Sequence, residues 1–287
     1  ENSYCLTQDD EGCTALHSVD TPEQTQILLN NVEDKNSFCL IQNKYGSTAL
    51  HEAKTAEQTQ VLLDNVKDKE SYCLLKDHFG HTALHQANTA EQTQVLLDNV
   101  KDKEAYYLIQ DNYGYTALHW AKTAEQTQIL LDNVKDKESY CLIQDNYGYT
   151  ALHYAKTAEQ TQILLDNVND KEAYCLIQNR NGYTALHRAW ISEQTQLLLD
   201  TVKDPEAYCL IKDNFGCNAL HLARSAEQTQ ILLDTVKDPE AYCLIKDNFG
   251  CNALHYARTA EQTQILLDNV RDPEAYCLIQ NHNGHTA

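Results

Sequence analysis

The stretch Gly148–Ala155, with the sequence GYTALHYA, recurs along the chain with small changes. Its glycine keeps a fixed interval. The nine glycines of the chain lie at positions 12, 46, 80, 114, 148, 182, 216, 250 and 284, each 34 residues after the one before. A fixed period of this length predicts a repeat architecture. The 287 residues therefore correspond to eight periods of 34, or 272 residues, and 15 more, rather than to one or two ordinary domains.

One repeat contains signals for three helices. Thr150 is an N-cap residue type and opens a short first helix. Thr157 opens the second helix, and Gln160, three residues later, has the spacing of a capping box. The second helix then carries one apolar stripe, which consists of Thr161, Leu164, Leu165 and Val168.

Acidic residues followed by proline mark the third helix, as at Asp204, Asp238 and Asp272. This helix is short, about two turns. Each glycine closes an Asp/Asn-x-x-Gly turn, in which glycine can supply a positive φ. We expect the stacking of neighbouring repeats to bury one continuous core. Its predicted members are Leu152, Ala155, Leu164, Leu165, Leu176, Ile177 and their equivalents.

The motif Gly-x-Thr-Ala-Leu-His-x-Ala, present from Gly12 to Gly250, resembles the Gly-x-Thr-Pro-Leu-His-x-Ala signature of the ankyrin repeat. The tetratricopeptide repeat has the same period but needs a Trp-x2-Leu-Gly-x2-Tyr pattern that the sequence lacks. The resemblance implies an all-α, ankyrin-like helical repeat solenoid of about eight 34-residue repeats. We expect one array over residues 1–287, with incomplete repeats at both ends, as part of a longer chain.

The sequence departs from the ankyrin pattern on either side of the second helix. Between His153 and Leu164 it is about three residues shorter, and after the Leu-Leu pair it is about four residues longer. We therefore expect helix lengths and stack curvature that differ from those of ordinary ankyrin arrays.

The charge balance disfavours two classes of partner. The chain has 22 Lys and Arg against 42 Asp and Glu, a net charge of −20, which opposes binding to nucleic-acid phosphates and to anionic lipid surfaces. The apolar runs are far shorter than the roughly 18 residues that cross a bilayer. We predict no nucleic-acid partner and no membrane insertion.

A histidine recurs at positions 17, 51, 85, 119, 153, 187, 221 and 255. Equivalent helices of neighbouring repeats lie about 8–10 Å apart, so these histidines cannot share one zinc ion, whose ligand nitrogens lie within about 2.1 Å. The family resemblance implies a structural role, in which the histidine holds its own turn and the neighbouring repeat by hydrogen bonds.

The cysteines also follow the repeat, at positions 5, 39, 73, 141, 175, 209, 243 and 277, with Tyr107 replacing one. This pattern indicates a small buried hydrophobic position. An odd total of 11 favours reduced thiols and a cytoplasmic location. Cys13, Cys217 and Cys251 each precede a histidine by four residues, which is a weak metal signal because no third ligand accompanies the pair. We predict no metal and no cofactor.

Comparison of the repeats separates framework positions from variable positions. Variation concentrates at the two residues before each glycine, at the residue after it, at the residue after the repeated histidine, and two residues further on. We call these the variable positions. The resemblance implies that they line a concave binding face, and Tyr, Trp and Arg dominate interface hot spots. The predicted partner-binding residues are Tyr113, Tyr115, Trp120, Tyr147, Tyr149, Tyr154, Tyr183, Arg188 and Trp190.

An alternative is that these rings only stack on adjacent repeats and stiffen the array. The variable positions also differ from the rest of the repeat in the sign of their charged residues. Lysines and arginines occupy several variable positions, whereas the acids cluster on the second and third helices. These cations are Lys54, Lys122, Lys156, Arg224 and Arg258. A partner with apolar and acidic elements would suit such a face.

No nucleophile–base pair or phosphate-binding loop stands outside the repeat framework, so we predict that the chain is not an enzyme. The leading hypothesis is a module for protein–protein interaction. One alternative is a structural spacer or a segment that self-associates through uncapped ends, and near-identical repeats such as 205–238 and 239–272 favour it. Another is a targeting array of a multidomain effector, which would place a bacterial protein in a host cytosol.

Overall fold

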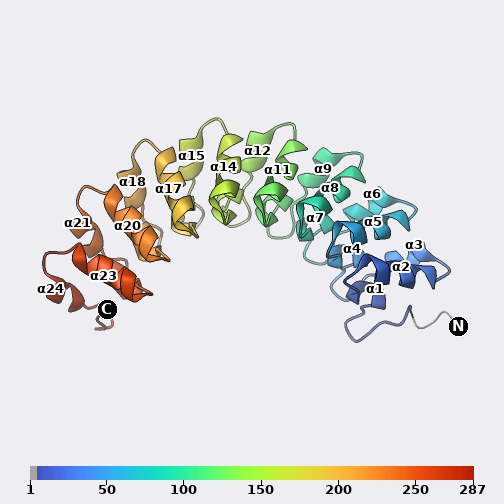
Figure 1. Cartoon of the computed structure of the whole chain (residues 1–287), viewed down its shortest axis with the longest axis horizontal. Helices are drawn as coiled ribbons and strands as arrows, with labels where there is room; N and C mark the ends of the chain where they lie inside the picture. Colours follow the sequence, from blue (N-terminus) through green and yellow to red (C-terminus); the bar gives the residue numbers. More distant parts are fainter. Residues whose placement is uncertain (1–4) are drawn as a thin grey trace. The chain divides into compact units, whose positions relative to one another are not determined.

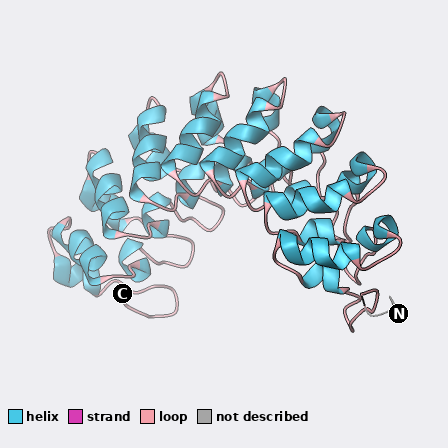
Figure 2. Cartoon of the chain, turned by 45° about the vertical axis from the view of Figure 1, so that its right-hand side comes forward, coloured by secondary structure: helices cyan, strands magenta, loops and turns pink. Residues whose placement is uncertain are grey.

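The computed structural model describes residues 5–287, and within them the chain forms 24 helices and no strand (Figure 1). The all-α prediction is therefore confirmed. The chain divides into two compact units, Glu1–Asn146 and Tyr147–Ala287. Figure 2 shows the helices of each unit joined by loops alone. The prediction of one array over residues 1–287 stays a prediction.

The first unit contains four repeats of three helices each. The first helices are α1 (Ala15–Ser18), α4 (Ala49–Glu52), α7 (Ala83–Gln86) and α10 (Ala117–Trp120). The second helices are α2 (Pro22–Asn30), α5 (Ala56–Asp64), α8 (Ala90–Asp98) and α11 (Ala124–Asp132). The third helices are α3 (Lys35–Cys39), α6 (Lys69–Leu74), α9 (Lys103–Tyr107) and α12 (Lys137–Cys141). First helices pack on first helices of the next repeat, and second helices on second helices.

The second unit repeats this arrangement. Its first helices are α13 (Ala151–Tyr154), α16 (Ala185–Arg188), α19 (Ala219–Leu222) and α22 (Ala253–Tyr256). Its second helices are α14 (Ala158–Asp166), α17 (Ser192–Thr201), α20 (Ala226–Thr235) and α23 (Ala260–Asp268). Its third helices are α15 (Lys171–Leu176), α18 (Pro205–Leu210), α21 (Pro239–Leu244) and α24 (Pro273–Cys277). The same like-on-like packing holds between neighbouring repeats.

The predicted N-caps are confirmed. Thr157 Oγ1 accepts a hydrogen bond from the backbone N–H of Gln160 at 3.1 Å, and Asp204 accepts from the N–H of Ala207 at 2.9 Å. The predicted capping box at the second helix is wrong in one half. Gln160 Oε1 accepts from the N–H of Lys156 at 2.9 Å instead of returning to Thr157.

This glutamine is buried in every second helix from α5 onward. In α8, Gln92 Nε2 donates to Ala53 O at 2.9 Å and to Thr59 Oγ1 at 3.0 Å, both in the preceding repeat. Its Oε1 accepts from the N–H of Asn88 at 2.8 Å. The same bridge to the preceding repeat is made by Gln58, Gln126, Gln194, Gln228 and Gln262. One side chain thus satisfies two backbone groups and joins two repeats.

The core prediction is correct for the first and second helices and wrong for the third. Leu176 is 38% exposed and Ile177 is half-buried, whereas Tyr174 and Cys175 are buried. The third helix has only five or six residues, and its tyrosine takes the inward face. At four repeats the tyrosine hydroxyl has a backbone partner in the core, as where Tyr208 donates to the carbonyl of Cys175 at 2.9 Å. The buried hydroxyls of Tyr106 and Tyr140 have no such partner among the described residues.

The glycine turn joins each repeat to the next one. Asp111 Oδ1 accepts from the N–H groups of Tyr113 and Tyr115 at 2.8 and 3.0 Å, which shapes the turn. Gly114 has φ +85°, and the Asn146 N–H of the next repeat donates to Tyr113 O at 2.8 Å. A Cβ on Gly114 would lie 2.7 Å from Asn146 N. Glycine is therefore required both for the turn and for the close approach.

We predict that Gly114→Ala destabilises the protein more than Gly284→Ala. Both glycines have positive φ, which costs a side-chain-bearing residue about 1–2 kcal/mol. Only Gly114 faces a neighbouring backbone, since nothing lies within 4 Å of a Cβ at Gly284. Urea unfolding followed by circular dichroism measures both variants. Equal losses of stability would contradict the role of the close approach.

Candidate binding surface

The repeated histidine fixes the position of each turn and thereby of the variable positions beside it. His85 Nδ1 accepts from the backbone N–H of Thr82 at 3.1 Å, so in the neutral ring the proton lies on Nε2. His85 Nε2 lies 3.1 Å from Ile109 O, just after the third helix of the same repeat, and 3.1 Å from Tyr115 O of the next repeat. The structural role that the resemblance implied is confirmed. Burial lowers the pKa of His85 to about 4, which keeps the ring neutral.

In the first unit, the structure brings three predicted binding residues together, and we call them the first aromatic patch. Its members are Tyr113, Tyr115 and Trp120. The ring centroids of Tyr113 and Tyr115 are 6.4 Å apart, and those of Tyr115 and Trp120 are 5.6 Å apart. Trp120 Nε1 donates to Asp111 Oδ2 at 3.3 Å, so the indole is tied to the turn of its own repeat.

A groove of about 470 Å³ lies beside this patch, within the range of volumes of small-ligand or side-chain pockets. Its aromatic lining consists of Tyr45, Phe79 and Trp120, and Lys54 and Lys122 add positive charge. Only Trp120 of these was in the predicted binding set. Tyr45 and Phe79 occupy the same variable position as Tyr113, which was the signal for them in the sequence.

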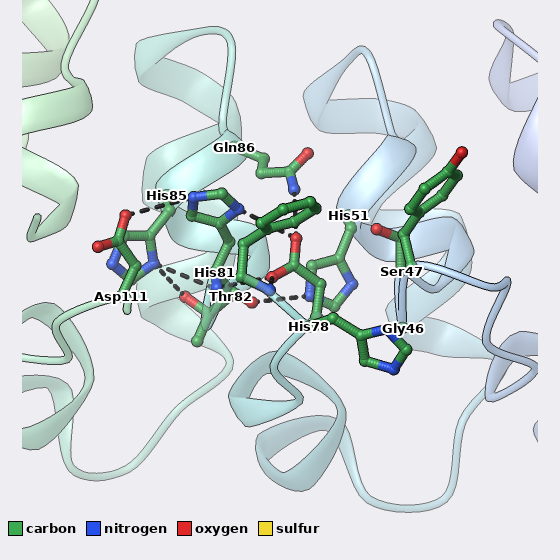
Figure 3. Close-up of polar contacts among 12 residues, drawn as sticks. Gly46, Ser47, His51, His78, His81, Thr82, His85, Gln86 and Asp111 are labelled. Carbon is green, nitrogen blue, oxygen red and sulfur yellow. Dashed lines mark hydrogen bonds and ion pairs between the residues drawn. The ribbon is translucent and has the colours of Figure 1, made fainter. Parts of the chain in front are cut away.

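His81 lies in this groove between two carboxylates (Figure 3). Its Nδ1 is 3.0 Å from Asp77 Oδ2, and its Nε2 is 3.3 Å from Asp111 Oδ2. Asp111 and then Asp77 raise the pKa of His81, although partial burial acts in the opposite direction. The ring of His81 also meets Trp120 edge-on, with centroids 5.4 Å apart. One turn aspartate, Asp111, therefore holds side chains from two repeats.

The remaining predicted residues lie in the second unit, and we call them the second aromatic patch: Tyr147, Tyr149, Tyr154, Tyr183, Arg188 and Trp190. Among them, the structure brings Tyr149, Tyr154 and Arg188 together. The rings of Tyr149 and Tyr154 are 5.3 Å apart, and the guanidinium carbon of Arg188 lies 5.7 Å from the centre of the Tyr149 ring. Tyr183 packs against His187 with ring centroids 5.9 Å apart. These contacts tie the half-buried tyrosines to the array.

Exposure divides the predicted residues into two groups. Tyr113, Trp120, Tyr147 and Trp190 are 40–48% exposed. Tyr115, Tyr149, Tyr154 and Tyr183 are half-buried. The half-buried rings agree with the stiffening role that the sequence left open, whereas the exposed rings offer apolar area to another molecule. The assignment of these residues to partner binding stays a prediction.

Most cysteines at the repeat position are buried. All eleven cysteines of the chain are free, and those at the repeat position from Cys39 to Cys243 are buried. Burial raises the pKa of Cys175 to about 12, so its thiol stays protonated at neutral pH. Across residues 5–287, no group of three or more His, Cys, Asp or Glu could hold a metal ion. In the same part of the chain, every helix is too short or too polar to span a membrane.

Comparison with known proteins gives a clear result for the fold. No family model matches the sequence, and no curated protein matches it. Among solved structures, 354 chains match. One is the ankyrin repeat domain of Bcl-3, described as a unique member of the IkappaB protein family. It is 25% identical, the match covers 78% of this chain and 99% of that one, and the TM-score is 0.51.

We predict that stability decreases as the pH falls from about 7.5 to 5. Burial lowers the pKa of His51, His85, His187 and His221, so the unfolded chain binds more protons than the folded one below the unfolded pKa of about 6.5. Each such histidine costs up to about 1.4 kcal/mol per pH unit in that window. The urea midpoint, measured by circular dichroism across this range, should decrease.

His81 acts in the opposite direction, since its raised pKa adds stability as it becomes protonated. His81→Gln should therefore make the decrease steeper between about pH 7.5 and 6.5. A urea midpoint that stays constant or increases on acidification would contradict the neutral state of the buried histidines.

Proposed function

This chain belongs to the ankyrin repeat family, and we propose that it is a non-enzymatic module that binds a partner protein through its variable positions. The proposed contact residues are the first and second aromatic patches. The observation that supports this proposal most strongly is the exposure of Tyr113, Trp120, Tyr147 and Trp190 on a hydrogen-bonded framework.

The physical argument concerns the cost of ordering side chains. An interface gains most from large aromatic side chains that lose little freedom on binding. Trp120 is already held by its hydrogen bond to Asp111, and Tyr113 and Tyr115 pack on each other within the same turn. These rings offer apolar area that is largely ordered before a partner arrives. The same framework recurs from repeat to repeat, whereas the residues at the variable positions differ. Such differences are expected of a surface that is selected to bind one partner.

The membership in the family agrees with this proposal, since ankyrin arrays generally serve protein–protein interaction. The match to Bcl-3 supports a protein–protein interaction module in general and does not identify a partner. Both the absence of enzymatic activity and the absence of a nucleic-acid partner stay predictions.

The test is a triple variant, Tyr113→Ala, Trp120→Ala and Tyr147→Ala. Affinity capture with the intact chain from an extract of the source organism identifies a partner, whose affinity for each variant is then measured by calorimetry. The triple variant should bind about ten-thousandfold more weakly, since each of the three hot-spot rings contributes about 2 kcal/mol or more and every 1.4 kcal/mol is a factor of ten. These rings are substantially exposed, so the far-ultraviolet circular dichroism should keep its helical signal.

The matched control is Glu91→Gln, Glu125→Gln and Glu159→Gln, at exposed positions in the first turns of α8, α11 and α14. This variant should bind the partner as the parent chain does. Unchanged binding by the aromatic triple variant would overturn the assignment of the surface.

A second candidate function is a spacer or self-associating segment. One observation favours it, namely the exposure of large apolar side chains in the outermost described repeats, at Ile27 (61%) and Leu278 (66%). Light scattering over a range of concentrations distinguishes the two functions. Self-association predicts an apparent mass that increases with concentration, and a constant monomer mass would exclude it.

A further inference from the structure

Three arginines at variable positions of the second unit have no acidic partner. Arg188, Arg224 and Arg258 have no carboxylate within the 4.0 Å of an ion pair, among the residues that the structure describes. In the second unit, three cations on the loops before third helices are paired with glutamates. Lys203, Lys237 and Arg271 lie 2.6, 2.8 and 3.0 Å from Glu172, Glu206 and Glu240. The three arginines therefore keep their positive charge unpaired in a chain of net charge −20.

Aromatic rings hold two of these arginines in place. The guanidinium carbon of Arg224 lies 4.1 Å from the centre of the Trp190 ring, and that of Arg188 lies 5.7 Å from the centre of the Tyr149 ring. Such stacking orients the planar guanidinium and leaves its edge for hydrogen bonds. The Nε atoms of Arg188 and Arg224 are buried and have no hydrogen-bond partner in the structure. A buried donor without an acceptor costs stability.

The three arginines also oppose one another. Burial lowers the pKa of Arg224, and the positive charges of Arg188 and Arg258 lower it further. The nearby carboxylates accept hydrogen bonds from turn N–H groups and from a tyrosine hydroxyl rather than from these arginines. Asp213 accepts from the N–H groups of Phe215 and Cys217 at 2.8 Å, and Asp247 Oδ2 accepts from the hydroxyl of Tyr256 at 2.6 Å. An uncompensated cluster of this kind is stabilised by an external anion.

We propose that Arg188, Arg224 and Arg258, together with Trp190, bind an acidic segment of the partner protein through its carboxylates. This inference rests on the proposed function and specifies the chemistry of the partner. Guanidinium groups match carboxylates in bidentate geometry, and Trp190 provides an apolar contact beside them. A long polyanion is a poorer occupant, because the array repels it outside the range of these three charges, about 8 Å at physiological salt.

The repeat spacing sets the spacing of the acids. Arg224 and Arg258 occupy equivalent positions one repeat apart. Neighbouring helices lie about 8–10 Å apart, and an extended chain advances about 3.3 Å per residue. Carboxylates at every third residue of an extended segment therefore match successive repeats.

The experiment measures the binding of a fluorescent short peptide with glutamate at every third position, by anisotropy at about 50 and 300 mM salt. The chain should bind it, more tightly at low salt and more tightly than a peptide of the same composition with all its glutamates adjacent. Arg224→Ala with Arg258→Ala should weaken binding about tenfold or more, since both ion pairs are lost. The matched control, Lys237→Ala with Arg271→Ala, removes the same charge and should have little effect.

Equal binding by the arginine variant and the parent chain, or an equal loss in the control, would overturn the proposal. Tighter binding of an oligodeoxythymidylate than of the peptide would also overturn it, because phosphates would then be the preferred anion. Light scattering identifies the remaining occupant: a chain that dimerises, and that loses this property with Arg224→Ala and Arg258→Ala, uses its own acidic surface and contradicts a separate partner segment.

The two proposals fail separately. The triple variant of Tyr113, Trp120 and Tyr147 retains all three arginines and Trp190. If that variant captures the partner unchanged, the proposed aromatic surface is wrong, whatever the peptide result. If the arginine variant binds the peptide unchanged, only the acidic-segment site is wrong.

Discussion

The arrangement of the repeats depends on one buried side chain, the glutamine near the start of each second helix from α5 onward. Gln92 illustrates it, with Nε2 donating to Ala53 O and Thr59 Oγ1 of the preceding repeat and Oε1 accepting from Asn88 N. Apolar packing alone allows neighbouring helices to slide, because it has little directional preference. A buried amide permits no such freedom, since each unsatisfied polar group costs about 1–3 kcal/mol. The glutamine therefore fixes the register in which two repeats can stack.

That register places every other inter-repeat contact. The backbone bond from Asn146 N to Tyr113 O and the bond of His85 Nε2 to Tyr115 O form only when the turns align. Because these framework groups satisfy one another's hydrogen bonds, the residue types at the variable positions beside them can differ from repeat to repeat. Some variable residues make hydrogen bonds within the array, as Trp120 does when it donates to Asp111. Others keep exposed area or unpaired charge, and these carry the proposed function. Ion pairs such as Lys237–Glu206 lie elsewhere, at the third helices.

The sequence was most informative where the causes are local. Thr157, Asp204 and the glycines were correctly predicted as caps and turns, because each acts on the backbone within a few residues. It failed where the local motif does not show which partner or which face a side chain takes. Gln160 was interpreted as a capping residue, and Leu176 was predicted to be buried in place of the tyrosine at 174. The groove lined by Tyr45 and Phe79 was missed for a related reason: ring density along the sequence does not show which rings meet across repeats.

The most direct test of this account is a double-mutant cycle between Gln92 and Thr59, using Gln92→Met and Thr59→Val, with unfolding by urea at neutral pH. These residues lie in adjacent repeats, 3.0 Å apart through Nε2 and Oγ1. If the bridge fixes the register, each single variant is destabilised, and the double variant loses less than the sum by about 1 kcal/mol. Strictly additive losses, or single variants as stable as the parent chain, would contradict the account.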